Sequence, residues 1–380
     1  NCNPMFRTAL RFIRFDRAKS IGVVVGIVIS TFLIGQQVGI FTFLTGLMSA
    51  LVDNSNGDIW VVDAKTQDAN SLGLLDVRIV REARSIEGVA TAYGVALANG
   101  TAVLPNGKSS PVLMIGSEAP AFAAGPRPDK IKSGTLANLE AENAITADFY
   151  DAAVYDMQPE VGVQLEINGK RAVINAITDN LRGFAGNTVY TTLERANYYG
   201  NRNGTAISAV IVNVKPGYDP ARVRNEINQH IYGVRAWIRK DFSRSTIAYT
   251  LGSTGIGAST GTLIVFAIIS GFFIIGLTMY SSALDRIRDY GTLKAIGASN
   301  MYVRRLILTQ AAVFAVVGFV IAYTLLEGFR MGVRSSGLTF EFSWQVKLGM
   351  FAITLFIALF GAIFALRRIN GVEPAAVFRG

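Results

Sequence analysis

The sequence predicts an α-helical membrane protein with four transmembrane helices and a mixed α/β extracytoplasmic domain between the first and the second helix. Three observations support this fold class. Four long segments lack charged side chains, the excess of basic residues lies beside those segments, and residues 45–255 alternate strand-like and helix-like patterns. Only 17% of the 380 residues are charged, whereas soluble domains average about 25%, so the deficit indicates segments that lie in lipid.

The uncharged segments are long enough to cross a bilayer, because a hydrocarbon core of about 30 Å needs roughly 20 apolar residues in a helix. They cover residues 20–52, 245–284, 306–326 and 348–366. The first two exceed the bilayer thickness, so we expect each to extend outward as a stalk. The predicted order is TM1 and stalk (20–52), stalk and TM2 (245–284), TM3 (306–326), a short external loop (327–345) and TM4 (346–366).

The charge distribution predicts which ends face the cytoplasm. Residues 45–255 carry 20 Lys/Arg and 21 Asp/Glu, whereas the rest of the chain carries 16 and 6. By the positive-inside rule, both termini and residues 285–305 are cytoplasmic, and residues 45–255 are external. The net charge of +9 therefore belongs to the membrane flanks and does not indicate a nucleic-acid partner. The flanking basic residues are Arg7, Arg11, Arg14, Arg17, Lys19, Arg286, Arg288, Lys294, Arg304, Arg305, Arg367, Arg368 and Arg379.

Residues 5–19 predict an interfacial amphipathic helix that contacts membrane lipids. Apolar residues recur with helical spacing and arginines repeat that spacing one residue later. A merely solvated basic segment is the alternative. The sequence leaves open whether residues 1–4 are native. The apolar residues with this spacing are Phe6, Leu10 and Ile13, and the arginines are Arg7, Arg11 and Arg14.

The external domain, residues 53–244, is expected to bury its own core and to form two subdomains. Asn106-Gly107 and Asn168-Gly169 predict hairpin turns. Strand-like runs cover residues 58–63, 110–116, 161–168, 172–177 and 207–215, and helix-like runs cover 75–85, 146–154 and 219–231.

No catalytic residue or metal site is predicted. Residues 252–259 have the outline of a phosphate-binding loop, but Ala258 stands where a lysine is needed. Residues 257–261 match G-x-S-x-G, which requires a later histidine, and the only histidine, His230, comes earlier. We therefore interpret the segment as a small-residue hinge. Cys2 is the only cysteine, which excludes an intramolecular disulfide and a cysteine-built metal site.

Small and polar residues in TM1 predict close helix packing. Small residues four apart let another helix approach, and glutamines near lipid need hydrogen-bond partners. Packing within one subunit and contact across a homodimer both remain open. The candidates are Gly22, Gly26, Gly35, Gln36, Gln37 and Gly39.

The most specific stretch lies in the predicted cytoplasmic segment 285–305. It resembles the signature of the MacB/FtsX/LolC-E type ABC transporter permease family: Arg, two variable residues, Glu-Ile-Gly, and a Leu-Arg-Ala-Ile-Gly-Ala run. Asp289, Tyr290 and Lys294 replace Glu, Ile and Arg, as in the DevC-like branch, which it most resembles. The tail 367–380 is similar to the family ending, with Phe378 for Leu. The candidate ATPase-coupling residues are Asp285, Arg286, Arg288, Asp289, Tyr290, Gly291, Leu293, Lys294, Ala295, Ile296, Gly297 and Ala298.

The resemblance implies a permease subunit in the bacterial inner membrane, without an ATP site of its own, whose coupling helix receives force from a cytoplasmic ABC ATPase dimer. ATP and Mg²⁺ would be bound by that partner and no cofactor by this chain. A second permease copy, a periplasmic adaptor and an outer-membrane component are implied partners; homodimer and heterodimer both remain open. The implied function is export or extraction of a lipid, lipoprotein or glycolipid by mechanotransmission. The alternative is an FtsX-like subunit that activates a periplasmic cell-wall hydrolase.

Overall fold

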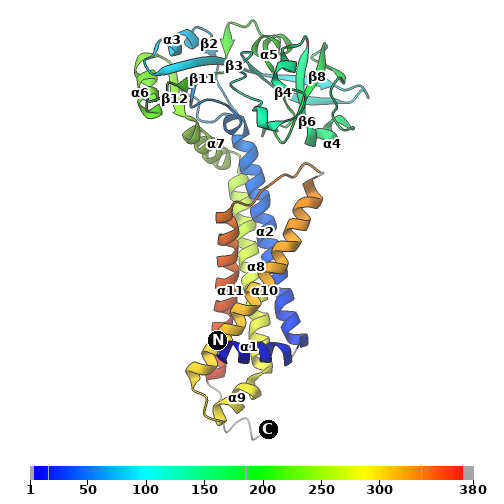
Figure 1. Cartoon of the computed structure of the whole chain (residues 1–380), viewed down its shortest axis with the longest axis vertical. Coiled ribbons are helices and arrows are strands. Elements are labelled where there is room, and N and C mark those ends of the chain that lie inside the picture. Colours follow the sequence, from blue (N-terminus) through cyan, green and yellow to red (C-terminus); the bar gives the residue numbers. More distant parts are fainter. Residues whose placement is uncertain (1–3, 16, 185, 335, 371–380) are drawn as a thin grey trace. The chain divides into compact units, whose positions relative to one another are not determined.

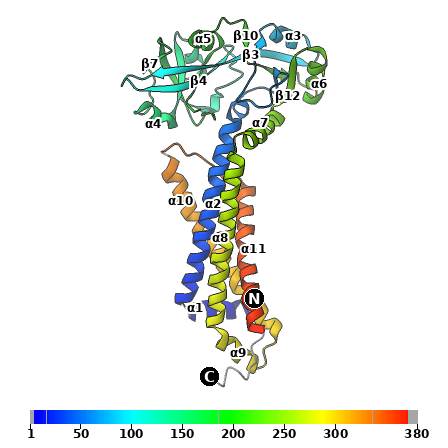
Figure 2. The same ribbon diagram turned by 180° about the vertical axis from the view of Figure 1, so that it is seen from behind.

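The computed structural model describes residues 4–15, 17–184, 186–334 and 336–370. They belong to two units. The first lies within residues 1–43, 258–334 and 338–380, and the second within residues 44–257 and 335–337. Figures 1 and 2 show the long helices of the first unit and the mixed sheet and helices of the second.

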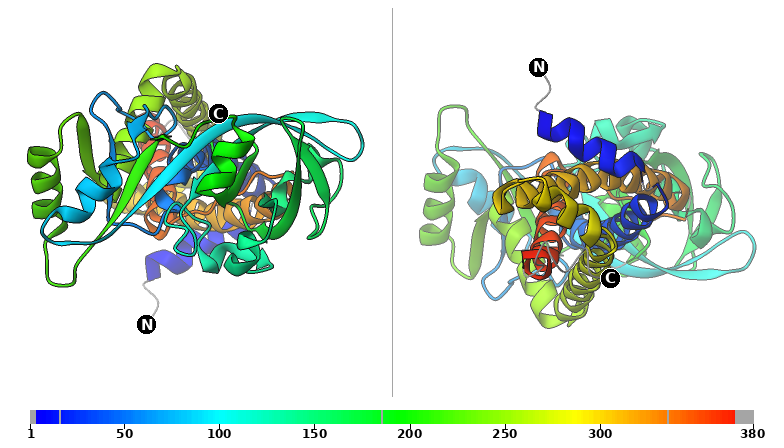
Figure 3. Two further views of the ribbon diagram at one scale, coloured as in Figure 1. Left: turned by 90° about the horizontal axis from the view of Figure 1, so that it is seen from above. Right: turned by 90° about the horizontal axis from the view of Figure 1, so that it is seen from below.

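Four helices of the described chain are long and apolar enough to cross a membrane, which confirms the predicted fold class. They lie side by side in both views (Figures 1 and 2). Two shorter helices complete this unit, and one of them, α1, crosses the ends of the long helices (Figure 3). The helices are α1 (Pro4–Phe15), α2 (Arg17–Asp53), α8 (Ile256–Asp285), α9 (Ile287–Ala295), α10 (Asn300–Arg334) and α11 (Trp344–Asn370).

Several observed bounds differ from the predicted ones. The amphipathic helix ends at Phe15, and Arg17 already belongs to α2, whereas the prediction ran the first helix through residue 19. The predicted stalk before TM2 is two helices, α7 (Arg239–Ser253) and α8, because the chain turns at Gly255 with φ +71°. Helix α10 continues to Arg334, so the segment between the last two spans is shorter than predicted.

The long helices pack through small residues. A methyl group added at Gly318 of α10 would lie 2.5 Å from Ile27 Cγ2 of α2, and one at Gly361 of α11 would lie 2.9 Å from the Gly276 Cα of α8. Glycine therefore sets the spacing of these helix pairs, as expected where van der Waals packing drives association in lipid. Helix α8 is the least covered span, with 17% of its most apolar window buried.

The second unit is built on a ten-stranded mixed sheet, and β2 and β10 form a separate two-stranded sheet. One half has the order β12-β1-β11-β3, all antiparallel, with α3 and α6 as crossover helices. The other half is inserted between β3 and β11. The strands are β1 (Ile59–Asp63), β2 (Leu75–Asp76), β3 (Val89–Val103), β4 (Ser109–Ser117), β5 (Ile131–Ser133), β6 (Ala144–Asp148), β7 (Gln164–Ile167), β8 (Lys170–Thr178), β9 (Thr188–Thr192), β10 (Ala206–Ile207), β11 (Ala209–Val214) and β12 (Val234–Ile238).

Strand β3 holds the two halves of the sheet together. Its first part pairs with β11 and its second part with β4, while its end also touches β7. Separate apolar clusters form on each half. The helices of this unit are α3 (Ile79–Ser85), α4 (Ala152–Tyr155), α5 (Leu193–Tyr199), α6 (Pro220–His230) and α7, with 3₁₀ turns at Pro128–Lys130, Leu136–Glu140 and Phe149–Asp151.

The local patterns predicted part of this domain correctly. Both Asn-Gly turns close hairpins, with positive φ at Gly107, Asn168 and Gly169. The helix predicted over residues 146–154 is correct only in its second part: residues 146–148 continue β6, which pairs in parallel with β8, and a 3₁₀ turn and α4 follow from Phe149. A short apolar run does not distinguish a buried strand from a helix, and here the parallel pairing decides. Strand β3 was missed because Gly94, Asn99 and Gly100 interrupt its pattern.

A buried polar cluster lies where β6 meets the following turn. Asp148 accepts hydrogen bonds from the Thr178 hydroxyl at 2.9 Å and from the backbone N–H of Leu181 at 2.7 Å. Asp151 is 4% exposed, and its Oδ2 has no hydrogen-bond partner among the described residues. Burial raises the pKa of Asp151 to about 7; the nearby Asp148 charge adds to this rise and Arg182 opposes it.

We predict that this carboxyl makes the domain less stable as pH rises. Between about pH 4 and pH 7 the folded Asp151 holds a proton that the unfolded chain has lost, so the free energy of unfolding falls with pH in that window. Asp151→Asn should flatten this dependence and raise the melting temperature at pH 7.5. Glu160→Gln, at an exposed position, is the control. An unchanged pH profile in thermal unfolding of Asp151→Asn would contradict the assignment.

Candidate functional site

Helix α9 and its two ends form the candidate site. The helix closes with a Schellman motif: the N–H of Ala298 donates to the Leu293 carbonyl at 2.9 Å, and the N–H of Gly297 donates to the Lys294 carbonyl at 3.0 Å. Gly297 has φ +103°, a conformation that favours glycine. The Ile-Gly-Ala part of the motif is therefore the sequence of a helix end.

The next residue begins another helix. The Ser299 hydroxyl accepts a hydrogen bond from the N–H of Tyr302 at 3.2 Å, as an N-cap residue does at the third helical position. The chain thus leaves α9 and enters α10 through four residues, 296–299. This tight corner fixes the direction of α9 relative to α10.

Arg286 fastens the start of α9 to two other helices. It is 4% exposed; its Nη1 donates to the Phe12 carbonyl of α1 at 3.0 Å and its Nη2 donates to the Ser20 hydroxyl of α2 at 3.3 Å. The Ser20 hydroxyl in turn donates to the Ile13 carbonyl at 2.9 Å. One guanidinium therefore links the end of α8 to the corner between α1 and α2.

Tyr290 fixes the middle of α9. Its ring is 1% exposed and stacks on Phe12, with ring centroids 6.1 Å apart and planes 1° apart. Its hydroxyl lies 3.3 Å from Gln310 Oε1 of α10 and donates to it. Gly291 beside it is also buried. Side chains of α1, α2 and α10 therefore hold α9 and the residue before it.

The opposite side of α9 is exposed. Ile296 is 79% exposed although it is apolar, and a hollow of about 440 Å³ between α1 and α9 adds charged groups, with Lys19 Nζ 3.7 Å from Asp285 Oδ2. Of the twelve predicted residues, the buried ones are Arg286, Tyr290 and Gly291; the half-buried ones are Leu293, Lys294 and Ala298; the exposed ones are Asp285, Arg288, Asp289, Ala295, Ile296 and Gly297.

Sequence reasoning missed the partners of the buried residues. Phe12, Ser20 and Gln310 complete the arrangement, and the Ser299 side chain caps the start of α10. A polar Gln310 within an apolar run was the one available signal, because a polar side chain in such a segment needs a partner. The sequence around Phe12 and Ser20 does not indicate that these residues contact Arg286 and Tyr290.

The candidate packing glycines of α2 differ in whether another part of the chain lies against them. A methyl group at Gly26 would contact Thr278 of α8 at 3.2 Å, and methyl groups at Gly35 and Gly39 would clash with Leu326 and Phe340 of the same chain. Gln36 and Gln37 are half-buried. Gly22 is exposed and has nothing within 4 Å of an added methyl group. Three of the four glycines therefore serve packing within this chain.

The part of the chain that the structure describes contains no cluster of three metal-ligating side chains. His230 ends α6, and its side chain is 60% exposed beside Glu226. Among the described residues around α9, no nucleophile and base are brought together.

Comparisons with known proteins match both units. Residues 20–230 match the family model of a MacB-like periplasmic core domain, and residues 261–374 match that of an FtsX-like permease C-terminal region. An uncharacterized ABC transporter permease of Mycobacterium tuberculosis is 26% identical over 243 residues, which is 60% of this chain and 61% of the relative. One from Methanocaldococcus jannaschii is 26% identical over 45% of each chain. The chain thus spans about three fifths of the former relative's length.

Among solved structures, the periplasmic region of MacB from Actinobacillus actinomycetemcomitans matches with a TM-score of 0.39 and 10% identity. The match covers 50% of this chain and 93% of that one.

We predict that Arg286→Met loosens α1 from α9. The substitution removes the donors to the Phe12 carbonyl and the Ser20 hydroxyl, which should cost about 1.5–3 kcal/mol of stability. Hydrogen exchange should rise in residues 4–15. Arg288→Met, an exposed arginine on the same helix, should change neither stability nor exchange. Equal exchange in both variants would show that the bonds of Arg286 do not hold α1.

Proposed function

Because this chain belongs to the ABC transporter permeases that combine a MacB-like periplasmic core domain with an FtsX-like permease region, we propose that it is a membrane subunit on which a separate cytoplasmic ATPase docks at α9. The observation that carries the proposal is the two-sided character of α9. Its inner side is fastened by Arg286 and Tyr290 to three other helices, while its outer side carries exposed charges and Ile296.

The ATPase would supply the chemistry. In this proposal ATP and Mg²⁺ bind to that partner, and two permease copies face an ATPase dimer. The sequence supports this division, because residues 252–259 lack the phosphate-binding lysine. The exposed charges of α9 suit the docking of the ATPase. Complementary charges on two proteins steer their association and fix the orientation of the complex.

Helix α2 provides a route for force. It runs unbroken from Arg17 to Asp53. Near its start Ser20 binds Arg286, and near its end Leu51 and Val52 pack in the core of the large domain with Trp60. A continuous helix transmits displacement along its axis, so closure of the ATPase would move the large domain without a path for substrate through the lipid.

The exported molecule would be a lipid, lipoprotein or glycolipid of the envelope, handed to a periplasmic adaptor and an outer-membrane component. The spans contain almost no ionisable residues, whereas a polar substrate path within the bilayer is expected to contain some. Co-purification from the native membrane in mild detergent tests this assignment. An adaptor is expected among the captured proteins, whereas capture of a cell-wall hydrolase instead would favour the FtsX-like signalling role.

We predict that charge changes on the exposed side of α9 uncouple the ATPase. Ile296→Asp and Asp289→Arg should each weaken association about 5- to 30-fold, because central interface residues contribute about 1–2 kcal/mol or more. Binding can be measured by pull-down with the cognate ATPase, and turnover by phosphate release. Tyr232→Asp, at a 99% exposed tyrosine of the large domain, is the control. Unaltered association and turnover in both α9 variants would exclude docking there.

We also predict that α9 and the large domain lie on opposite sides of the bacterial inner membrane. In a Cys2→Ser background, Tyr232→Cys should react with a membrane-impermeant maleimide in spheroplasts. Ile296→Cys should react only after permeabilisation. Labelling of both positions in intact spheroplasts would overturn the proposed orientation, in which both termini are cytoplasmic.

A further inference from the structure

A groove between α1, α2 and α10 has the chemistry of a lipid site. Its volume is about 560 Å³. Arg14 and Arg17, both exposed, line it where α1 meets α2. Its remaining walls are apolar except for Ser20. They are formed by Ile13, Ile21, Val24, Val25 and Val28 on one side and by Val313, Phe314, Val317 and Ile321 of α10 on the other.

The floor of the groove is closed by helix packing. Gly318 brings α10 so near α2 that an added methyl group would lie 2.5 Å from Ile27 Cγ2, and Phe314 is 4% exposed. The groove is therefore a surface channel with a fixed base. Its outer edges stay open, since Ile21 is 61% and Val25 is 47% exposed.

The length of the groove matches one leaflet. From Arg17 to Val28 the α2 wall rises roughly 16 Å at 1.5 Å per residue, and half of a bilayer core of about 30 Å is about 15 Å. Positive charge at one end and apolar walls along the rest complement an acidic headgroup with a hydrocarbon tail. A soluble anion would leave the apolar part unfilled, and a zwitterionic lipid would gain less from the arginines.

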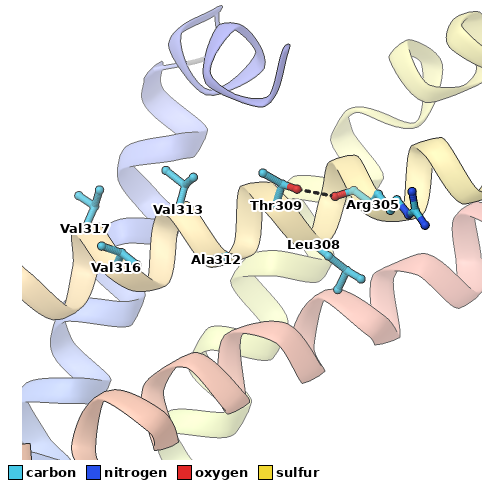
Figure 4. Close-up of a pocket in the computed structure, with 7 residues that line it drawn as sticks. All are labelled: Arg305, Leu308, Thr309, Ala312, Val313, Val316 and Val317. Atoms are coloured by element: carbon cyan, nitrogen blue, oxygen red, sulfur yellow. Dashed lines mark hydrogen bonds between the residues drawn. The ribbon is translucent and has the colours of Figure 1, made fainter. Parts of the chain in front are cut away.

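A second groove continues on the neighbouring face of α10. It is lined by Arg305, Leu308, Thr309, Ala312, Val313, Val316 and Val317 (Figure 4). The two grooves share Val313 and Val317, which project to the same side of α10 in Figure 4. A lipid with two acyl chains can place one on each side of this valine pair.

We propose that this groove binds one anionic phospholipid of the leaflet that contains α1, with the phosphate at Arg14 and Arg17 and an acyl chain along α2 and α10. The bound lipid braces the corner between α1 and α2, because Ser20 lines the groove and also accepts the hydrogen bond from Arg286. The site does not require the ATPase, so it can be tested on the purified chain.

Native mass spectrometry of the full chain, titrated with phosphatidylglycerol or phosphatidylcholine, tests the site. One phosphatidylglycerol should bind in preference to phosphatidylcholine. Removing one arginine should weaken this binding about 5-fold, and Arg14→Gln with Arg17→Gln about 30-fold, at about 1 kcal/mol per basic residue. Arg304→Gln, an exposed arginine outside both grooves, should bind normally. Equal affinity for the two lipids, or full affinity in the double variant, would overturn the proposal.

A second pair of variants tests the apolar part. Val317→Trp should fill the groove and abolish the preferred binding, whereas Val320→Trp, 58% exposed and outside both grooves, should not. Thermal unfolding checks that both variants are folded. In a Cys2→Ser background, Val317→Cys should form no disulfide-linked dimer in oxidised membranes. A disulfide-linked dimer would show that a second copy of the chain occupies the groove, and would refute the lipid site.

Discussion

The arrangement around α9 depends on one buried guanidinium. Arg286 lies among apolar helices, and burying a charge is costly unless hydrogen bonds satisfy it. Here the Phe12 carbonyl and the Ser20 hydroxyl accept bonds from the two terminal nitrogens, while Nε has no hydrogen-bond partner among the described residues, so the stability of the buried charge depends on the positions of α1 and the start of α2. Tyr290 adds a ring stack and a hydrogen bond to α10. A nine-residue helix, too short to be stable alone, is thereby stabilised by its neighbours.

Glycine has two different uses in the helical unit. Between the long helices it allows close approach, as at Gly318 against Ile27. At Gly297 nothing lies within 4 Å of an added methyl group, and the positive φ alone requires glycine. Only the first use depends on a neighbouring helix. The predicted coupling motif therefore has a local explanation in its Gly-Ala-Ser end and a tertiary explanation in its Arg and Tyr.

The large domain shows why a mixed sheet is harder to derive from sequence. Strand β3 is fifteen residues long, yet it carries glycine, alanine and asparagine where a strand pattern needs large apolar residues. Its glycine at position 100 faces Ile167 and Met114, so the missing side chain is replaced by residues from β7 and β4. The local sequence around Gly100 does not show that residues of other strands fill this space. It also does not show the parallel pairing with β8 that makes residues 144–148 a strand.

The sequence by itself determined the four apolar spans, the neutral domain between the first two and the Asn-Gly hairpins, because each depends on hydrophobicity, charge or turn geometry over a few neighbouring residues. The twelve candidate residues around α9 were predicted from the resemblance to a family motif. Only the tertiary structure decided which side of α9 is buried, since the partner of Arg286 at Phe12 is 274 residues away. It also decided that Gly26, Gly35 and Gly39 serve packing within the chain. The local sequence shows that a small or polar residue needs a packing or hydrogen-bond partner. Only the folded chain shows which helix provides that partner.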